Sequence, residues 1–473
     1  MKPTFIRTLL LSSAGAVMVG AVIDLNQLPN YANQPVPSYI NKDNTQLHNP
    51  ITDAGATLGR VLFYDKQLSA NQTISCASCH QQAFAFSDTA RLSRGLTNGL
   101  TGRHSMRLIN SRFANEEHFF WDERAATLEE QSTRPIQDHV EMGFSGTEGD
   151  PGFDSLIRRM QGIPYYKPLF TKAFGDSVIT ETRIQRALAQ FVRSIQSFDS
   201  RYDVGRAQVN NDADPFPNFT LQENQGKALF LAPPGAGGAG CQGCHQAPEF
   251  DIDPNSQNNG IITSGQDPTI LDLNNTRAPS LRDLFNPGGF LNGPMMHNGN
   301  FTSLMNVINH YNAITVDSAN PRLDPRLAGP PGSGGQRLNL TQPQKGSLVA
   351  FLRTLTGTLV YTDPRWSDPF DSLGNLTVLD GFPTALSDEL PPIDLQLYPN
   401  PVSDWLNITL ASPATAASQI RIQDMRGRTV HTGQLTRGSA TAQLDLSLVP
   451  SGVYAVTLTL DNRTATRRIV ISH

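Results

Sequence analysis

The chain has 473 residues, and its 37 Lys and Arg against 42 Asp and Glu give a formal net charge of −5, which argues against a polybasic nucleic-acid-binding protein. Its length predicts about three domains, and 38% hydrophobic residues are enough to bury their cores. The 38 Gly and 33 Pro predict extensive loops and exclude a coiled coil.

Residues 1–23 are predicted to form a signal peptide. Lys2 and Arg7 precede the apolar run Leu9–Ile23, which is shorter than the roughly 20 residues of a membrane-spanning helix. Gly20 and Ala21 resemble a cleavage site, and an N-terminal membrane anchor is the alternative. Both interpretations predict export.

The four cysteines form two CxxCH motifs, the attachment signature of c-type haem. The motifs comprise Cys76, Cys79 and His80 in the first copy and Cys241, Cys244 and His245 in the second. Each Cys can form a thioether to the porphyrin, and the following His can coordinate the iron. Disulfides, a thioredoxin-like pair and half a zinc site explain this order less well. We therefore expect two covalently bound haems.

The segments before the two motifs are alike, which indicates an internal duplication. Leu58–Phe63 precedes the first motif and Gln225–Phe230 precedes the second, so each unit predicts a helix, a loop and an attachment turn. Thr220 with a Glu three residues later predicts a helix start. Apolar faces predict further helices over residues 180–198 and 341–355.

Longer stretches around both motifs resemble one known family. They include Phe120-Trp121-Asp122, Arg277-Ala278-Pro279-Ser280-Leu281-Arg282-Asp283, His297-Asn298-Gly299 and His310-Tyr311-Asn312. Over about residues 45–365 the chain resembles the bacterial dihaem cytochrome c peroxidases and the related enzyme that matures the tryptophan tryptophylquinone cofactor. We expect a mainly α fold with two cytochrome c-like haem domains and long loops, over residues 35–205 and 206–365.

The resemblance implies that the N-terminal haem reacts with peroxide and that the C-terminal haem accepts electrons. Peroxide reduction needs an open iron position and a carboxylate that moves a proton. Glu141 matches the family's distal Glu, and Gln131 matches a Gln whose amide could orient peroxide. Trp121 matches a Trp between the haems. A solvated carboxylate and a core aromatic are the alternatives for Glu141 and Trp121.

One departure from the family concerns the loop expected to cap the N-terminal haem. Many members cap the oxidised N-terminal haem with a His on a mobile loop, but the corresponding residues 94–101 contain none. His104 is the nearest and is either a distal ligand or a polar neighbour of the haem. It lies where the family usually has Asn near a calcium ion. The carbonyls of Asn292 and Pro294 match two calcium ligands, so calcium stays open.

The sixth ligand of the C-terminal haem is predicted to be Tyr311 or Met296. In the family a Met or a Tyr stands about fourteen residues after the His of a motif matched here by His297, and that spacing favours Tyr311, on a helix starting near Thr302. Met295 and His310 are further candidates. A thioether stabilises reduced iron, whereas an anionic oxygen stabilises oxidised iron and would favour an oxidase.

The C-terminal part changes composition twice. Residues 366–392 are predicted to be a linker, and from Leu395 the apolar period becomes two, which predicts a small all-β sandwich over residues 393–473. The series Tyr398-Pro399-Asn400-Pro401, Leu444-Asp445-Leu446 and Gly452-Val453-Tyr454 resembles the type A sorting domain of the type IX secretion system. This implies that machinery as a partner and delivery to the cell surface or beyond, with the periplasm as alternative. A carbohydrate-binding or adhesive module is the other interpretation.

Together these features predict a peroxidase that reduces hydrogen peroxide with electrons from a small cytochrome c or cupredoxin. The alternatives are a dihaem oxidase acting on a protein or organic substrate, and a non-enzymatic electron-transfer cytochrome. Glu141, Gln131 and Trp121 favour an enzyme, because an electron carrier needs no carboxylate beside an open iron. No nucleic-acid partner is expected, and a homodimer is left open.

Overall fold

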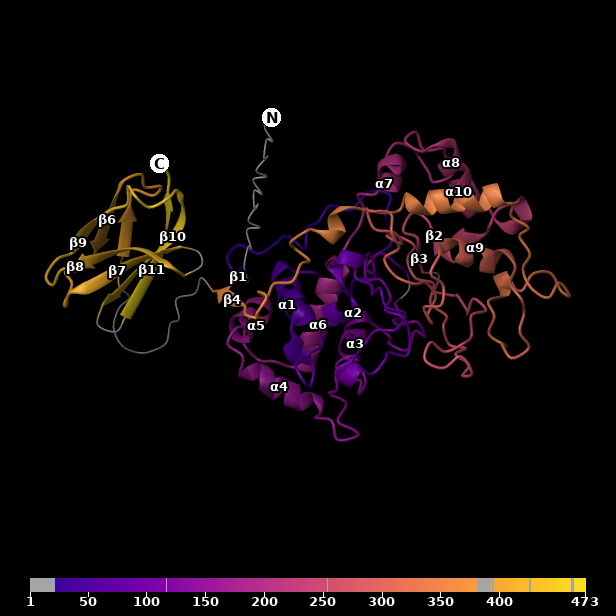
Figure 1. The fold of residues 1–473 in the computed structure, drawn as a ribbon, viewed down its shortest axis with the longest axis horizontal. Helices are drawn as coiled ribbons and strands as arrows, with labels where there is room; N and C mark the ends of the chain where they lie inside the picture. The colour runs from indigo at the N-terminus through magenta and orange to yellow at the C-terminus, as the bar shows by residue number, and fades with distance from the viewer. Residues whose placement is uncertain are drawn as a thin grey trace, which may run out of the picture. The chain divides into compact units, whose positions relative to one another are not determined.

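The computed structural model describes residues 22–380, 393 and 395–473, apart from residues 116, 253, 425, 426, 461 and 462. The chain divides into two compact units, residues 1–381 and 382–473 (Figure 1). Residues 1–21 of the predicted signal peptide and residues 381–392 of the predicted linker lie outside the described residues. In the described part of the chain, no helix is long and apolar enough to cross a membrane.

The first unit consists of short helices joined by long loops. Its helices are α1 (Asp53–Tyr64), α2 (Cys76–Cys79), α3 (Leu128–Thr133), α4 (Phe153–Gln161), α5 (Tyr166–Phe174), α6 (Glu181–Ser194), α7 (Arg201–Arg206), α8 (Leu221–Leu231), α9 (Leu304–Asn312) and α10 (Gln342–Arg353). Its strands are β1 (Val22–Asp24), β2 (His245–Gln246), β3 (Asp251–Ile252) and β4 (Thr377–Leu379), paired as β1 with β4 and β2 with β3.

The predicted helices form, with shifted ends. At the start of α8, Glu223 accepts a hydrogen bond from the Thr220 backbone N–H at 2.7 Å, so the capping box is confirmed. The helix expected over residues 180–198 ends at Ser194. It stops early because the backbone N–H of Asn110 donates to the Ile195 carbonyl at 2.9 Å and draws the chain into an extended segment.

The duplication is visible in two helix crossings. α1 packs on α6, and α8 packs on α10. A Cβ added at Gly59 would lie 1.9 Å from the Ala187 carbonyl oxygen, and one added at Gly226 would lie 1.9 Å from the Ser347 carbonyl oxygen. Both repeats thus use a glycine at the same place so that two helix backbones can approach closely.

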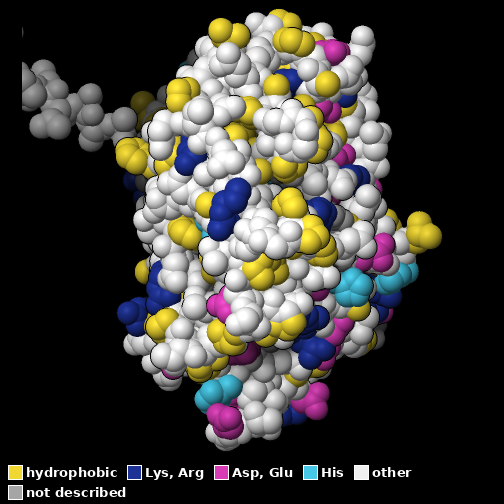
Figure 2. All heavy atoms as spheres, turned by 90° about the vertical axis from the view of Figure 1, so that its right-hand side faces the viewer, with side chains coloured by type: hydrophobic (Ala, Val, Ile, Leu, Met, Phe, Trp, Pro, Cys, Tyr) yellow, Lys and Arg dark blue, Asp and Glu magenta, His cyan; other side chains and the backbone are white. Residues whose placement is uncertain are grey.

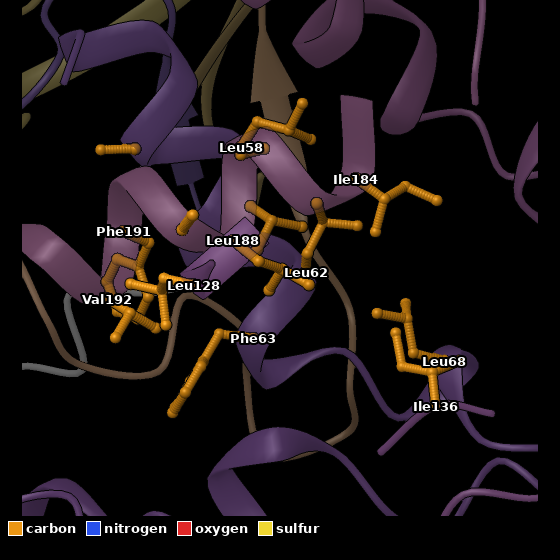
Figure 3. Packing of buried hydrophobic residues seen from close by; sticks show 14 of the residues in the cluster. Leu58, Leu62, Phe63, Leu68, Leu128, Ile136, Ile184, Leu188, Phe191 and Val192 are labelled. Atoms are coloured by element: carbon orange, nitrogen blue, oxygen red, sulfur yellow. The ribbon is translucent and has the colours of Figure 1, made fainter. Parts of the chain in front are cut away.

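Two separate apolar clusters underlie the two repeats. The first joins α1, α3 and α6, as Figure 3 shows for Leu62, Phe63 and Phe191. The second includes a group of aromatic rings in contact with one another, among them Tyr202, Phe216, Phe230, Phe250 and Phe351. Tyr202 precedes the expected domain boundary at residues 205 and 206, and that boundary stays a prediction.

Both ends of the first unit return to the first cluster. Trp366 is 1% exposed there, and β4 lies parallel to β1. The linker expected from residue 366 is therefore folded as far as β4, because Trp366 and β4 have partners to pack against. Val22 and Ile23, the last residues of the predicted signal peptide, belong to β1, and Ile23 is buried. The folded unit therefore overlaps that segment by two residues.

The second unit is all-β and has one apolar core. One sheet has the order β5 (Leu395–Tyr398), β6 (Trp405–Leu410), β9 (Thr441–Asp445), and the other has β11 (Arg463–Ile471), β10 (Gly452–Leu460), β7 (Ser418–Asp424), β8 (Thr429–Leu435). Alternate residues such as Leu406, Ile408 and Leu410 point into the shared core. The period of two seen in the sequence is therefore the alternation of buried and outward side chains.

Candidate functional site

The first CxxCH motif forms one helical turn on the wall of a cavity of about 390 Å³. The hydroxyl of Ser78 accepts a hydrogen bond from the Ser75 backbone N–H at 3.0 Å and holds this turn. Cys76, Cys79 and His80 all line the cavity. The Nδ1 atom of His80 lies 3.1 Å from the Phe86 carbonyl oxygen. That contact fixes the imidazole and leaves Nε2 for a metal, the usual arrangement of a ligating His.

Glu141 and Gln131 line the same cavity. Gln131 lies on α3, whereas Glu141 lies in a loop. The backbone N–H of Glu141 donates to the Asp138 carboxylate at 3.0 Å. Burial, reinforced by the nearby Asp138 charge, raises the pKa of Glu141 to about 7, and Arg124 opposes this rise. The structure thus brings a carboxyl group suited to proton transfer near neutral pH together with the amide and the attachment motif.

The loop of residues 94–101 packs on the backbone of Glu141. The Leu96 N–H donates to the Val140 carbonyl at 2.8 Å, and a Cβ on Gly95 would lie 2.2 Å from the same oxygen. His104 follows this loop, is 4% exposed and borders the cavities of both repeats. Its Nδ1 lies 3.1 Å from the Ala90 carbonyl oxygen. A distal-ligand role for His104 stays a prediction.

The second CxxCH motif lines a separate cavity of about 490 Å³. Cys241 lies in a short 3₁₀ turn, and His245 lies in β2, paired with Ile252 of β3. Burial lowers the pKa of His245 to about 4, so its imidazole is neutral and able to bind a metal. Cys244 also lines this cavity.

Both predicted sixth ligands reach this second cavity and share one partner. Asn259 Nδ2 donates to the Tyr311 hydroxyl at 3.0 Å and contacts the Met296 sulfur at 3.2 Å. Met295 also lines the cavity, whereas His310 is turned away and contacts the Asn259 carbonyl at 2.8 Å. Burial raises the pKa of Tyr311, so the phenol is protonated in the absence of a metal. The geometry therefore keeps both Tyr311 and Met296 as candidates.

Trp121 borders both cavities and is fixed from both repeats. Its indole N–H donates to the His104 carbonyl at 2.8 Å, and its own carbonyl accepts from the backbone N–H groups of Thr276 and Arg277. A buried Trp needs such a partner for its N–H. These contacts hold the ring in the wall between the two predicted haem sites.

The residues present fit a haem in each cavity. Each cavity joins two free thiols and a partly buried imidazole, and the walls include apolar side chains such as Leu188 and Leu284. Arg107 borders both cavities, and its Nε is buried with no hydrogen-bond partner in the described part of the chain. A buried cation of this kind fits the carboxylate groups that a haem carries. In such sites haem iron supplies the redox chemistry.

Calcium between the repeats stays a prediction. A Cβ on Gly293, which lies between Asn292 and Pro294, would be 2.3 Å from the Asp88 carbonyl oxygen and 3.3 Å from the His104 imidazole. An oxygen and an imidazole nitrogen therefore both border the segment whose carbonyl oxygens the resemblance assigns to calcium, and calcium prefers oxygen ligands. Among the described residues, no group of three or more His, Cys, Asp or Glu side chains could hold a metal ion.

Asn259 and Arg107 are site residues that the sequence did not predict. Asn259 lies in a loop 52 residues before Tyr311, and nothing in its local sequence marks it as a partner of that phenol. Arg107 follows shortly after His104, but its position between the cavities depends on the packing of both repeats. A buried cation is visible only once the fold is known.

Comparison with known proteins agrees with these sites. The family model for di-haem cytochrome c peroxidase matches residues 53–211, and that for the secretion system C-terminal sorting domain matches residues 396–472. Methylamine utilization protein MauG of Methylophilus methylotrophus is 32% identical over 321 residues, covering 66% of this chain and 85% of that protein. Cytochrome-c peroxidase IdrP1 of Denitromonas iodatirespirans is 27% identical over 365 residues, covering 69% and 88%.

A solved structure agrees as well. The crystal structure of a MauG-like protein associated with microbial copper homeostasis matches at 29% identity and a TM-score of 0.55, covering 71% of this chain and 99% of that one. Fold and motifs define a helical dihaem c-type protein. The chain belongs to the di-haem cytochrome c peroxidase family, whose members hold two c-type haems, and it carries a type IX sorting domain, which implies export.

Proposed function

We propose that the protein is a dihaem peroxidase that reduces hydrogen peroxide to water. One observation carries the proposal: Glu141 and Gln131 both line the cavity of the first CxxCH motif. Burial raises the pKa of Glu141 to about 7. Such a carboxylate can take a proton from one peroxide oxygen and return it to the other as water forms. The Gln131 amide can orient the bound peroxide.

Electrons are proposed to enter at the C-terminal haem and pass to the N-terminal haem past Trp121. Trp121 supports this route because it borders both cavities. The donor is proposed to be a small cytochrome c or cupredoxin. Apolar side chains lie dispersed among charged ones over the face of the second repeat in Figure 2, which suits the small, transient contacts of redox partners.

Replacing Glu141 tests the proposal. Glu141→Gln keeps the size of the side chain but removes its proton transfer, so turnover should fall by about 10²-fold or more. Glu148→Gln is the matched control because Glu148 lies nearby, is exposed and does not line the cavity. Haem spectra of both variants should match those of the unmodified protein. Unchanged turnover in Glu141→Gln would remove this residue from the mechanism.

An oxidase that acts on a protein or organic substrate is the second candidate. The hydrogen bond from Asn259 to Tyr311 favours it, because a phenol oriented toward the second cavity could become an anionic ligand that stabilises oxidised iron. The similarity to MauG supports the same candidate. A non-enzymatic electron carrier explains Glu141 poorly.

Delivery to the cell surface or the medium, rather than retention in the periplasm, is proposed from the sorting domain and its recognition by the type IX secretion machinery. Truncation after residue 392 should leave both haems in place, because the first unit has its own apolar clusters. The truncated chain should stay inside the cell envelope. Its normal appearance outside the cell would contradict the sorting role.

A further inference from the structure

Side chains that oxidise readily are concentrated in and around the first apolar cluster. They are Tyr31, Tyr64, Tyr165, Tyr166, Tyr361 and Trp366, which are five of the ten Tyr and one of the three Trp in the chain. Tyr31 and Tyr166 are fully buried, whereas Tyr64 and Tyr165 are partly exposed. None of the six borders the cavity of the first or the second repeat, so the peroxidase proposal leaves them without a role.

These residues begin one ring away from the first cavity. Phe63 lines that cavity, and the ring of Tyr64 lies 5.3 Å from the ring of Phe63. The Tyr64 hydroxyl donates to the Trp366 carbonyl at 2.6 Å. Asp65 follows Tyr64 directly in the chain, so Phe63 of the cavity wall, Tyr64 and a buried carboxylate are three consecutive residues.

Asp65 receives two phenols on one oxygen. Tyr165 and Tyr166 donate to its Oδ2 at 2.6 Å and 2.5 Å, and their rings lie 4.7 Å apart. The other oxygen, Oδ1, accepts from the Gln67 backbone N–H at 2.8 Å and starts the following turn. Oδ1 of Asp65 thus stabilises the turn, and Oδ2 accepts hydrogen bonds from the two phenols.

We propose that Tyr166, with Asp65 as its proton acceptor and Tyr165 as its partner toward the surface, is a redox site that supplies electrons to the N-terminal haem when the protein donor is absent. This inference rests on the proposed peroxidase function, because peroxide is the source of the oxidising equivalents. The site would prevent unused oxidising equivalents from damaging the haem pocket.

The step balances in electrons and protons. Tyr166 gives one electron to the oxidised haem group, its phenolic O–H bond breaks, and a new O–H bond forms on Asp65 Oδ2. The products are a neutral tyrosyl radical and a protonated carboxyl group. A small one-electron reductant such as ascorbate can then reduce the radical through the partly exposed Tyr165, and the proton returns from Asp65 to the phenolate oxygen.

The electrostatics of the cluster agree with a coupled transfer. Burial raises the pKa of Asp65 despite its hydrogen bonds from Tyr165 and Tyr166, so the carboxylate accepts a proton readily. Burial also raises the pKa of Tyr166, so this phenol keeps its proton until an electron leaves. Loss of the electron makes a phenol strongly acidic, and the short hydrogen bond gives the proton a place to go.

Rapid-freeze electron paramagnetic resonance on the full haem-loaded chain tests the site, with one equivalent of peroxide and no electron donor. A tyrosyl signal should form, and it should be lost in Tyr166→Phe with Tyr165→Phe. Tyr39→Phe is the matched control, because Tyr39 donates to the buried Asp203 at 2.9 Å but borders neither cavity. A tyrosyl signal of full size in the double variant would overturn the inference. The inference would also fail if peroxide changed the haem spectrum of the unmodified protein and no tyrosyl signal formed.

The haem spectrum separates this failure from failure of the proposed function. Peroxide that leaves the haem spectra unchanged would contradict the peroxidase and not the tyrosine site. Flash-generated ruthenium(III) tris-bipyridyl then supplies the oxidising equivalent to the same variants. A radical that Tyr165→Phe and Tyr166→Phe abolish would support the site, and a radical indifferent to both substitutions would overturn it.

Discussion

The two haem repeats share a scaffold but differ in what surrounds the expected iron position. Each has a glycine at a helix crossing, Gly59 or Gly226, followed by a loop and a CxxCH motif on a cavity wall. The first cavity is lined by Glu141, the carboxyl group proposed to transfer the proton. The second faces two potential iron ligands, Tyr311 and Met296, joined by one amide.

This difference indicates how two copies of one duplicated segment can acquire different functions. Both repeats keep the helix packing and the haem-attachment motif of the shared scaffold. The other side chains that line the two cavities come from loops and from α3 in the first repeat or α9 in the second. Loops can therefore change the chemistry of one repeat while the crossings preserve its fold.

The largest effect is expected from the attachment cysteines. The intact mass of the mature protein should exceed that of its polypeptide by two haems. Cys76→Ala with Cys79→Ala should remove one haem, and Cys241→Ala with Cys244→Ala should remove the other, since the thioether bonds are lost. Mass spectrometry of denatured protein gives the count. An apoprotein mass with disulfides in the unmodified protein would contradict both sites.

The pH dependence of turnover tests the division of labour at Glu141. Its carboxylate must be ionised to accept a proton, and burial raises its pKa to about 7. Below pH 7, kcat/KM should therefore rise about tenfold per pH unit and then level off above it. Glu141→Gln should abolish this rise. A pH profile that survives in the variant would assign the proton transfer to another group.

The shared scaffold predicts equal costs at its two glycines. Gly59→Ala and Gly226→Ala should each lower the free energy of unfolding by about 1 to 3 kcal/mol, because each Cβ would meet a carbonyl oxygen at 1.9 Å. Gly346→Ala in α10 has space and should be neutral or stabilising by up to about 1 kcal/mol. Chemical denaturation measures all three. If Gly226→Ala left the free energy of unfolding unchanged, the two helix crossings would not be equivalent.

The smallest effect, a spectral shift, distinguishes the two ligand candidates. If Tyr311 is the sixth ligand, Tyr311→Phe should change the spectrum and potential of one haem, while Met296→Leu leaves them nearly unchanged. The opposite pattern would assign Met296 and remove support from the oxidase candidate. Potentiometry with ligand-sensitive spectroscopy measures both variants.

The sequence predicted local features better than long-range ones. The capping box at Thr220 and the attachment motifs were visible because hydrogen bonds or covalent bonds join residues close in sequence. The early end of α6 depends on Asn110, and the folded segment around Trp366 depends on contacts with α1 and β1. Asn259 reaches its two partners only through the folding of a long loop. Such contacts leave no periodic signal.

Small-ligand binding tests the central proposal most directly, namely that peroxide reacts at the N-terminal haem and not at the C-terminal haem. Cyanide can be titrated into the full-length oxidised protein and followed by electron paramagnetic resonance. The signal altered by Tyr311→Phe or Met296→Leu identifies the C-terminal haem. Cyanide is predicted to saturate the signal of the N-terminal haem, while the signal of the C-terminal haem stays unchanged. Cyanide binding first at the C-terminal haem would contradict the account.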